Sequence, residues 1–294
     1  MISTIIVSED KPAQLHLLLD SLYKNGRNLF DITVLYKYSD VAFEKGYEIV
    51  QQRFYNKYRY NYRFPIRWAE RASSNLSEDL LLYLKQTRLL VCLFNDENVL
   101  FSNELSYRDV FQVFSKYNPC TLSLRLGNNT VIQNAYNIND YFIDKPSGGE
   151  FILDNFMLWD ASLVKPFTNF SMPFSHNGHV YTTKLINFIL EKTKIKDIND
   201  FEKALQDNLY MGAFGGFIPP SMSCLEYSAV INNSPKKVSD EIESDFGTSN
   251  FGLNDRYLSG SKIDYDFFNF KHISKPFEEF VTRFTSESYM HYGR

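Results

Sequence analysis

The sequence predicts an α/β protein with a mostly parallel sheet flanked by helices, a Rossmann-like class. Short β-branched and apolar runs typical of buried strands alternate with helix patterns over residues 1–127. Such alternation is typical of parallel sheets whose connections are helices. With 294 residues, of which 44% are hydrophobic, the chain is long enough to bury a large core.

The first two strand–helix units are the clearest. Residues 2–8 form a β-branched run that predicts a buried strand. Pro12 suits the first turn of a helix, and leucines at helical spacing continue until Gly26 ends it. Residues 30–40 predict the second strand and residues 41–54 the second helix.

The next elements follow from local start and stop signals. Residues 64–71 are predicted to be extended, because Pro65 disfavours a helix before it. Residues 77–88 predict a helix, with Ser77 as its N-cap and acids in its first turn. The apolar run at residues 89–94 predicts the next strand.

The later elements are less regular. Ser102 or Asn103 can cap a helix that ends near residue 117, and residues 120–127 predict one more strand. The remaining expectations are a helix starting at Thr182 or Thr183, another at 197–209, a strand at 224–233, irregular structure at 236–264 and a helical tail from 276. We expect one domain over 1–185 with an extension over 186–294 packed on it, or one continuous domain.

Residues 89–101, LLVCLFNDENVLF, place four polar residues inside an apolar run. Buried carboxylates are costly unless they are paired or bound to a metal. Ligands of parallel sheets bind at the carboxyl ends of the strands. Polar residues follow three of the predicted strands at such ends: Ser8, Glu9, Asp10, Ser39, Asp40 and Asn95 to Asn98. The acidic segment is either an ordinary turn or a site where a divalent cation grips a diphosphate.

At this point the chain resembles a family, the nucleotide-sugar glycosyltransferases of the A fold, in their family-2-like branch. ISTIIVSEDKPAQLHLLLDSL is similar to the opening of that family, and YLKQTRLLVCLFNDENVLF resembles its helix–strand–DxD unit. SLRLGNN, FMLWDASL, PFSHNGHVYTT and LNDRYLSGSKID also resemble segments of bacterial relatives. The chain departs from the family at the motif, because Asn98 stands where D-x-D has its second acid, unless the register is Asn95-Asp96-Glu97.

The resemblance implies transfer of a sugar from a nucleoside diphosphate donor to a glycan or lipid-linked acceptor, and it favours inversion. Mn²⁺ or Mg²⁺ would be held by Asp96, with Glu97 or Asn98. The base and ribose would lie against Ser8, Glu9, Asp10, Ser39 and Asp40. Arg71 and Lys85 would reach the diphosphate, and Arg125, a charge inside an apolar strand, is a further candidate. Capping or solvated surface roles remain the alternative for these residues.

An inverting transferase needs a base for the acceptor hydroxyl. The candidates are Asp160, His179 and Glu226, with Asp154 and His176 as further possibilities. Trp159 beside Asp160 either stacks on a sugar or belongs to the core.

Charge and composition limit the classes of binding partner and the cellular location that we expect. The net charge of −4 argues against nucleic acid. The three cysteines fit neither a zinc spacing nor a disulfide framework. No signal peptide and no transmembrane segment is evident, so we expect a cytoplasmic protein whose membrane contact, if any, is peripheral.

Two rival functions remain open. An A-fold protein with a degraded motif could act as a binding or scaffold partner, and the NDEN segment favours this reading. A nucleotidyltransferase is disfavoured, because SEDKP follows the first strand where a Gly-rich basic loop would be needed.

Overall fold

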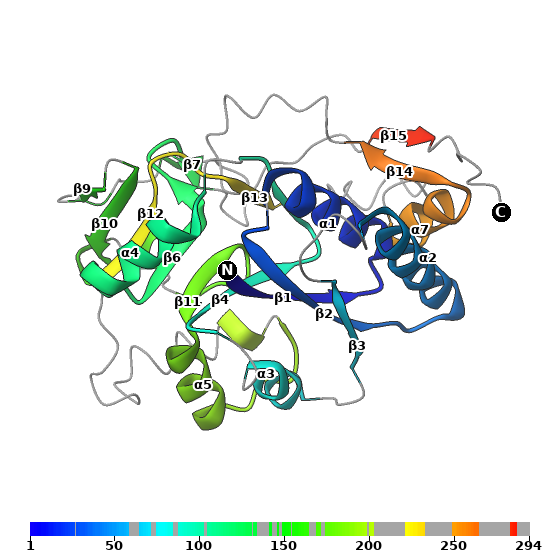
Figure 1. Cartoon of the computed structure of the whole chain (residues 1–294), viewed down its shortest axis with the longest axis horizontal. Helices are drawn as coiled ribbons and strands as arrows, with labels where there is room; N and C mark the ends of the chain where they lie inside the picture. The colour runs from blue at the N-terminus through cyan, green and yellow to red at the C-terminus, as the bar shows by residue number, and fades with distance from the viewer. Residues whose placement is uncertain are drawn as a thin grey trace.

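The computed structural model describes residues 1–26, 28–58, 65–71, 75–84, 88–102, 105–130, 132–133, 141–142, 146, 149–153, 155–164, 169–171, 174–198, 200–202, 221–232, 249–264 and 283–286. Its central feature is a nine-stranded sheet (Figure 1). The strands are β1 (Ile2–Glu9), β2 (Phe30–Lys37), β3 (Arg67–Glu70), β4 (Leu90–Asn95), β6 (Thr121–Gly127), β9 (Glu150–Ile152), β10 (Phe156–Asp160), β11 (His179–Thr182) and β12 (Ser221–Leu225). Their order is β3-β2-β1-β4-β11-β6-β12-β10-β9.

The direction of the strands confirms the predicted fold class. β1 pairs in parallel with β2 and β4, β2 with β3, and β6 with β12. β11 is antiparallel to β4 and β6, and β10 is antiparallel to β12 and β9. Only β10 and β11 therefore run against the other seven strands, and the protein is an α/β protein with a mostly parallel sheet.

Helices cover both faces of the sheet, as Figure 1 shows. On one face lie α1 (Pro12–Gly26), α2 (Val41–Tyr58) and α7 (Asn250–Leu258), and on the other lie α3 (Leu76–Leu84) and α5 (Thr183–Lys192). Side chains of a strand point alternately to its two faces. Ile2 and Ile6 of β1 accordingly join the core under α1, whereas Ile5 and Val7 join the core under α3 and α5. The molecule thus has two apolar layers separated by the sheet.

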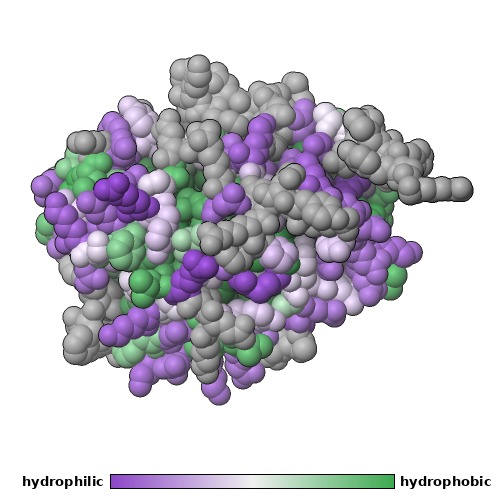
Figure 2. Space-filling model, in the orientation of Figure 1, coloured by the Kyte–Doolittle hydropathy of each residue, from purple (hydrophilic) through white to green (hydrophobic). Residues whose placement is uncertain are grey.

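The remaining described elements lie outside the nine-stranded sheet. They are α4 (Tyr107–Tyr117), the single 3-10 turns Ala161–Leu163 and Asn169–Ser171, and the paired strands β5 (Asn98–Leu100) with β13 (Val230–Asn232), β14 (Ser261–Asp264) with β15 (Arg283–Ser286), and β7 (Ile132–Gln133) with β8 (Tyr141–Phe142). Among the described residues, no helix is both long and apolar enough to cross a membrane. On the face seen in Figure 2, the coloured residues are largely hydrophilic, with hydrophobic ones in small groups.

Two helix starts differ from the prediction. The helix expected from Ser77 begins at Leu76, and the backbone N–H of Ser77 donates to the side chain of Asn75 at 3.1 Å. The helix expected from Ser102 or Asn103 begins at Tyr107, where Ser106 accepts from the N–H of Asp109 at 3.1 Å. Several residues near each start can cap, and the backbone path decides which one does.

The second half of the chain is more regular than predicted. The acidic segment leads into β5 and not directly into a helix, and the strand expected at 224–233 is two strands, β12 and β13. α7 and β14 lie in the segment 236–264 that was expected to be irregular, and β15 lies in the tail that was expected to be helical. β12 lies beyond residue 185 and belongs to the same sheet as β1.

Gly178 occupies a position that only glycine accommodates without strain. Its φ is +68°, and a Cβ there would lie 3.0 to 3.2 Å from the side chain of Val230. Its N–H donates to Leu93 of β4 at 2.8 Å and its carbonyl accepts from Leu124 of β6 at 2.8 Å. Gly178 therefore sets how β11 enters between two strands.

We expect Gly178→Ala to lower the free energy of unfolding by about 1 to 3 kcal/mol, because alanine is strained at positive φ. Urea denaturation measures this loss. Gly252→Ala in α7 is the matched control and is expected to be neutral or slightly stabilising, because alanine favours helix interiors. Equal stability of the Gly178→Ala variant and the wild type would contradict the assignment.

Candidate functional site

The candidate site lies at the carboxyl edge of four neighbouring parallel strands. β3, β2, β1 and β4 are adjacent in the sheet and run in one direction, so their carboxyl ends lie side by side. Residues after these ends are the predicted site residues Ser8 to Asp10, Ser39, Asp40, Arg71 and the NDEN turn (Asn95 to Asn98). The structure therefore brings together residues that lie up to 90 positions apart in the sequence.

Behind the edge, Ser8 is completely buried and bonds inside the protein. Its Oγ lies 2.8 Å from the hydroxyl of Tyr47 in α2, which also accepts from the N–H of Lys11 at 3.2 Å. Burial, strengthened by the charge of Asp96, raises the pKa of Tyr47, so the phenol stays protonated. Sequence reasoning missed both Tyr47 and Lys11. Tyr47 gives no local signal, since it reads as an apolar helix position.

Asp10 and Ser39 tie the ends of β1 and β2 together. The two carboxylate oxygens of Asp10 accept from the N–H and the hydroxyl of Ser39, at 2.8 and 2.7 Å. Asp10 has φ +56°, a conformation that Asp tolerates better than most residues. Asp40 accepts from the N–H of Ala42 at 2.7 Å and so caps α2, the structural role considered for it from the sequence.

Arg71 is a buried guanidinium at the same edge. Its side chain is 4% exposed, and its Nε lies 3.1 Å from a carboxylate oxygen of Asp79 in α3. Its Nη1 lies 3.9 Å from Glu9 at the end of β1. The two carboxylates hold this cation in place against the strand ends.

The acids of the NDEN turn are paired with a lysine. Asp96 is 4% exposed, and one of its oxygens accepts from the N–H of Glu9 at 3.2 Å. Lys11 Nζ lies 3.6 Å from the other oxygen of Asp96 and 2.7 Å from Glu97. Burial raises the pKa of Asp96 to about 6, although the charge of Lys11 opposes this rise. Burial would lower the pKa of Lys11, but Asp96 and Glu97 outweigh it and raise that pKa.

The amide side chains of Asn95 and Asn98 form hydrogen bonds within the NDEN turn. Asn98 is completely buried, accepts from the N–H of Asn95 at 3.0 Å and donates to Asn177 at 3.4 Å. The side-chain oxygen of Asn95 accepts from the N–H of Glu97 at 2.8 Å. The carbonyl oxygen that Asn98 would offer to a metal is therefore buried and already accepts a hydrogen bond.

A divalent cation does not fit this arrangement well. Mg²⁺ and Mn²⁺ favour carboxylate oxygens together with phosphate oxygens and waters. Both carboxylates of the turn already face the ammonium of Lys11, which would repel a second cation. Among the described residues, no group of three or more His, Cys, Asp or Glu side chains could hold a metal ion.

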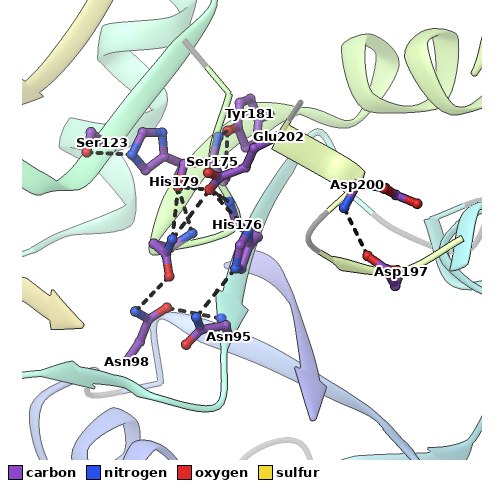
Figure 3. A network of polar contacts seen from close by, with 11 residues as sticks. Asn95, Asn98, Ser123, Ser175, His176, His179, Tyr181, Asp197, Asp200 and Glu202 are labelled. Atoms are coloured by element: carbon purple, nitrogen blue, oxygen red, sulfur yellow. Dashed lines mark hydrogen bonds and ion pairs between the residues drawn. The ribbon is translucent and has the colours of Figure 1, made fainter. Parts of the chain in front are cut away.

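Behind the turn, His176 and Glu202 form a polar network with Asn95 and Ser175, which Figure 3 shows. Glu202 Oε1 lies 3.1 Å from His176 Nδ1 and accepts from the hydroxyl of Ser175 at 2.6 Å. His176 Nε2 lies 3.4 Å from Asn95 Nδ2. The hydroxyl of Tyr181 accepts from the backbone N–H of Ser175 and donates to the carbonyl of Ser175, both at 2.7 Å. These two bonds hold the backbone beside His176 in place.

These neighbours favour one tautomer of His176. The N–H of Glu97 fixes the Asn95 amide so that its NH₂ group faces the ring. A donor at Nε2 and a carboxylate at Nδ1 together favour the proton on Nδ1. Nε2, the nitrogen without the proton in this tautomer, is the one that lies next to the NDEN turn, 3.4 Å from the Asn95 amide.

Glu202, the partner of this ring, was not predicted as a site residue. Burial would raise the pKa of Glu202, but interactions with His176 and Ser175 and the charge of Arg125 lower it to about 2. Its position in a helical pattern gave no signal of this role.

His179 and Arg125 are internal. His179 is 1% exposed, and its ring lies 2.8 Å from Ser123 Oγ and 3.4 Å from Thr121 Oγ1. Burial, strengthened by the charge of Arg125, lowers the pKa of His179 to about 3, so the ring is neutral. Arg125 is 4% exposed and acts electrostatically on both His179 and Glu202. Neither side chain is accessible to a substrate in this arrangement.

The other predicted catalytic residues lie elsewhere. β10 runs against β1, and Asp160 at its end pairs with Ser221 at the start of β12. The topology therefore places Asp160 at the opposite edge of the sheet from Asp96. Trp159 is buried in the core and donates to the carbonyl of Phe170 at 2.9 Å, which leaves no free face for a sugar. Lys85 and Asp154 lie outside the described residues.

Glu226 follows β12 at the same edge as the NDEN turn, three strands along the sheet from β4. The sequence predicted that Glu226 lies within a strand, but the structure places it in a bend. At about 4.8 Å per strand, this separation is about 14 Å. A pocket beside it is lined by Ser102, Leu105, Ser106, Asp109, Asn155, Phe156, Leu225, Glu226 and Tyr227.

Comparison with known proteins does not place the chain in a family. No protein-family model matches the sequence, and no curated protein matches it. Solved structures that match the chain include TarS of S. aureus, at 15% identity and a TM-score of 0.43, covering 78% of this chain and 59% of that one. This chain therefore spans less than two thirds of the TarS chain.

Two further matches are more distant. A 4-diphosphocytidyl-2C-methyl-D-erythritol synthase from Anaerococcus prevotii is 14% identical with a TM-score of 0.39, covering 88% of this chain and 98% of that one. The mannosyltransferase PcManGT from Pyrobaculum calidifontis, solved with GDP-Man and Mn²⁺, is 11% identical with a TM-score of 0.32, covering 45% of this chain and 40% of that one. At these identities and TM-scores, the matches carry no argument about what this chain does.

Proposed function

We propose that the protein is a glycosyltransferase that moves a sugar from a nucleoside diphosphate donor to a hydroxyl acceptor on a glycan or a lipid-linked glycan. The observation that carries the proposal is the convergence of charged groups at the carboxyl ends of β1, β2, β3 and β4. Ligands of α/β sheets bind at this edge. The linked pairs Asp10–Ser39 and Arg71–Glu9 span three of these strand ends, and Glu9 links them to Asp96 of the fourth.

The edge suits a nucleotide better than an apolar ligand. Asp10 and Ser39 are polar groups of the size that binds a ribose or a base, and Lys11, whose side chain is 26% exposed, is a cation that suits a diphosphate. The charge that grows on the departing diphosphate is the main charge to stabilise in this reaction. Lys11 would provide such stabilisation, and the buried Arg71 would add positive charge at the same edge.

His176 is the residue that we assign as the proton acceptor. An inverting transfer requires removal of a proton from the acceptor hydroxyl as the bond to the anomeric carbon forms. The ring of His176 is positioned beside the NDEN turn, with Nδ1 3.1 Å from Glu202 and Nε2 3.4 Å from the amide of Asn95. Glu226 and its pocket lie on the same edge and would contact the acceptor.

The proposal is tested by adding UDP, GDP, CDP or dTDP and measuring the melting temperature. A nucleotide that binds only the folded state at 100 times its Kd stabilises that state by about 2.7 kcal/mol. We expect one of the four to raise the melting temperature, and Asp10→Ala to reduce that rise. Glu191→Ala, an exposed change on α5, should leave it unchanged. If none of the four nucleotides raises it, the proposed function is wrong.

A measurement of sugar transfer distinguishes the proposed enzyme from a catalytically inactive binding protein. A catalytically inactive protein of this fold would bind the nucleotide and leave the donor sugar intact. Slow hydrolysis of the matching nucleotide sugar, followed as release of the nucleoside diphosphate, supports an enzyme. Binding without hydrolysis or transfer to any glycan tested favours a binding or scaffold protein.

A further inference from the structure

Lys11 occupies the place at the NDEN turn that a divalent cation would need. It is the residue before α1, and its backbone carbonyl accepts from the N–H of Leu15 at 2.9 Å. Its side chain crosses to the turn, where Nζ lies 2.7 Å from Glu97 and 3.6 Å from Asp96. The two carboxylates are 12% and 5% exposed, so they require a nearby positive charge.

The geometry of the turn keeps the ammonium in this position. Asp96 has its second oxygen bonded to the N–H of Glu9, which turns the first toward Lys11. The backbone N–H of Lys11 is itself held by the hydroxyl of Tyr47 at 3.2 Å. Lys11 is thus fixed at both its main chain and its side chain, as a residue with a structural charge would be.

The ammonium can also serve a ligand. It has three donors, of which one bonds Glu97 at 2.7 Å, while Asp96 lies 3.6 Å away. The side chain of Lys11 is 26% exposed, so an anion can reach it from the solvent. A phosphate oxygen placed there would meet a charge-assisted donor.

We infer that Lys11 replaces the metal ion at this site, so that the protein binds the diphosphate of its donor without a divalent cation. The acids of the NDEN turn then act as anchors of an ammonium and not as metal ligands. In transfer, the acceptor oxygen bonds to the anomeric carbon and its proton passes to His176. The C–O bond to the diphosphate breaks, its electron pair goes to the phosphate oxygen, and Lys11 faces the charge formed. This inference rests on the proposed function for the identity of the ligand.

The first test uses Mn²⁺ alone and needs no nucleotide. Electron paramagnetic resonance of free Mn²⁺ is measured against wild type, Lys11→Ala and the double variant Lys11→Ala with Asp96→Asn. We expect no saturable site in wild type, one weak site in Lys11→Ala, and its loss in the double variant. A wild-type site that Asp96→Asn removes would overturn the inference, and so would the lack of a site in folded Lys11→Ala. If circular dichroism shows that Lys11→Ala does not fold, Lys11→Gln replaces it.

The second test measures the Kd of the nucleoside diphosphate by calorimetry, in EDTA and in Mn²⁺. Wild type should bind equally well in both. Lys11→Ala should bind about ten- to hundredfold more weakly in EDTA, as expected for loss of a charge-assisted hydrogen bond, and Mn²⁺ should restore part of the affinity. Lys11→Arg should retain most of it.

Lys24→Ala is the matched control, because it removes the same charge from the other end of α1. The 15-residue helix is about 22 Å long, and this change should leave the Kd unaltered. Binding only in Mn²⁺ would overturn this inference and leave the proposed function standing. If the nucleoside diphosphate binds neither in EDTA nor in Mn²⁺, both the proposed function and this inference are wrong.

Discussion

Replacing His176 with alanine is expected to lower kcat for sugar transfer by about 10²- to 10⁴-fold, the usual contribution of general base catalysis. The Kd of the nucleoside diphosphate should stay unchanged, because the nucleotide is assigned to Asp10, Ser39 and Lys11, whereas the ring of His176 faces Asn95 and Glu202. Single-turnover transfer and calorimetry measure the two quantities separately. A variant that transfers at the wild-type rate would contradict the assignment.

Glu202→Gln removes the negative charge beside the His176 ring and keeps the size of the side chain. We expect a smaller loss of kcat than in His176→Ala. The ring of His176 stays in place but loses the carboxylate that faces its Nδ1 at 3.1 Å. Asp200→Asn is the matched control, since it removes a carboxylate charge from an exposed position two residues away.

The Glu202→Gln variant also tests how the stability of the fold depends on pH. Because the folded pKa of Glu202, about 2, lies below its ordinary value of 4.5, its charge stabilises the fold above pH 4.5. This contribution is lost as pH falls from 4.5 through about 2. Urea denaturation of wild type should therefore show a loss over this interval that Glu202→Gln lacks. Parallel curves for the two proteins would mean that Glu202 is not paired in the folded state.

Replacing Trp159 with alanine is expected to lower the free energy of unfolding by about 3 to 5 kcal/mol, as truncation of a buried aromatic side chain does. Trp159 is 3% exposed, packs its ring 5.3 Å from that of Phe170, and donates to the Phe170 carbonyl. Removing it leaves both a cavity and an unsatisfied carbonyl. Thermal and urea denaturation measure the loss.

Leu163→Ala is the control for this effect, because Leu163 is 71% exposed in the same region and should change stability by less than about 0.5 kcal/mol. The affinity for the nucleotide should survive in folded Trp159→Ala. A fully stable variant that loses only acceptor binding would instead assign Trp159 to a sugar platform, the role considered for it from the sequence.

The sequence predicted much of the edge of the sheet, because its signals are local. The β-branched run before Ser8 and the apolar run before Asn95 identify buried strands, and polar residues directly after a strand belong at its end. Neighbouring parallel strands end at the same edge, so the site could be located from the order of elements. The caps at Asn75 and Ser106 were missed, because several nearby residues could serve equally well.

The chemistry of the site could not be predicted in the same way, because it depends on contacts between distant residues. Lys11 and Glu97 are 86 residues apart, and His176 and Glu202 are 26 apart. A lysine after a strand and a glutamate in a helix pattern are each ordinary in their local context. Only the packing of β1 against β4, and of the segment at 202 against that at 176, makes them partners.

The sequence by itself determined the α/β class, the strands β1, β2, β3, β4 and β6, and the polar residues at the ends of β1, β2 and β4, since periodicity and capping act over a few residues. The tertiary structure decided which residues share that edge. The reversal of β10 carries Asp160 to the opposite edge, and the insertion of β11 brings His176 to the turn while burying His179. Strand direction and side-chain pairing depend on how the whole chain packs, and no local pattern in the sequence records them.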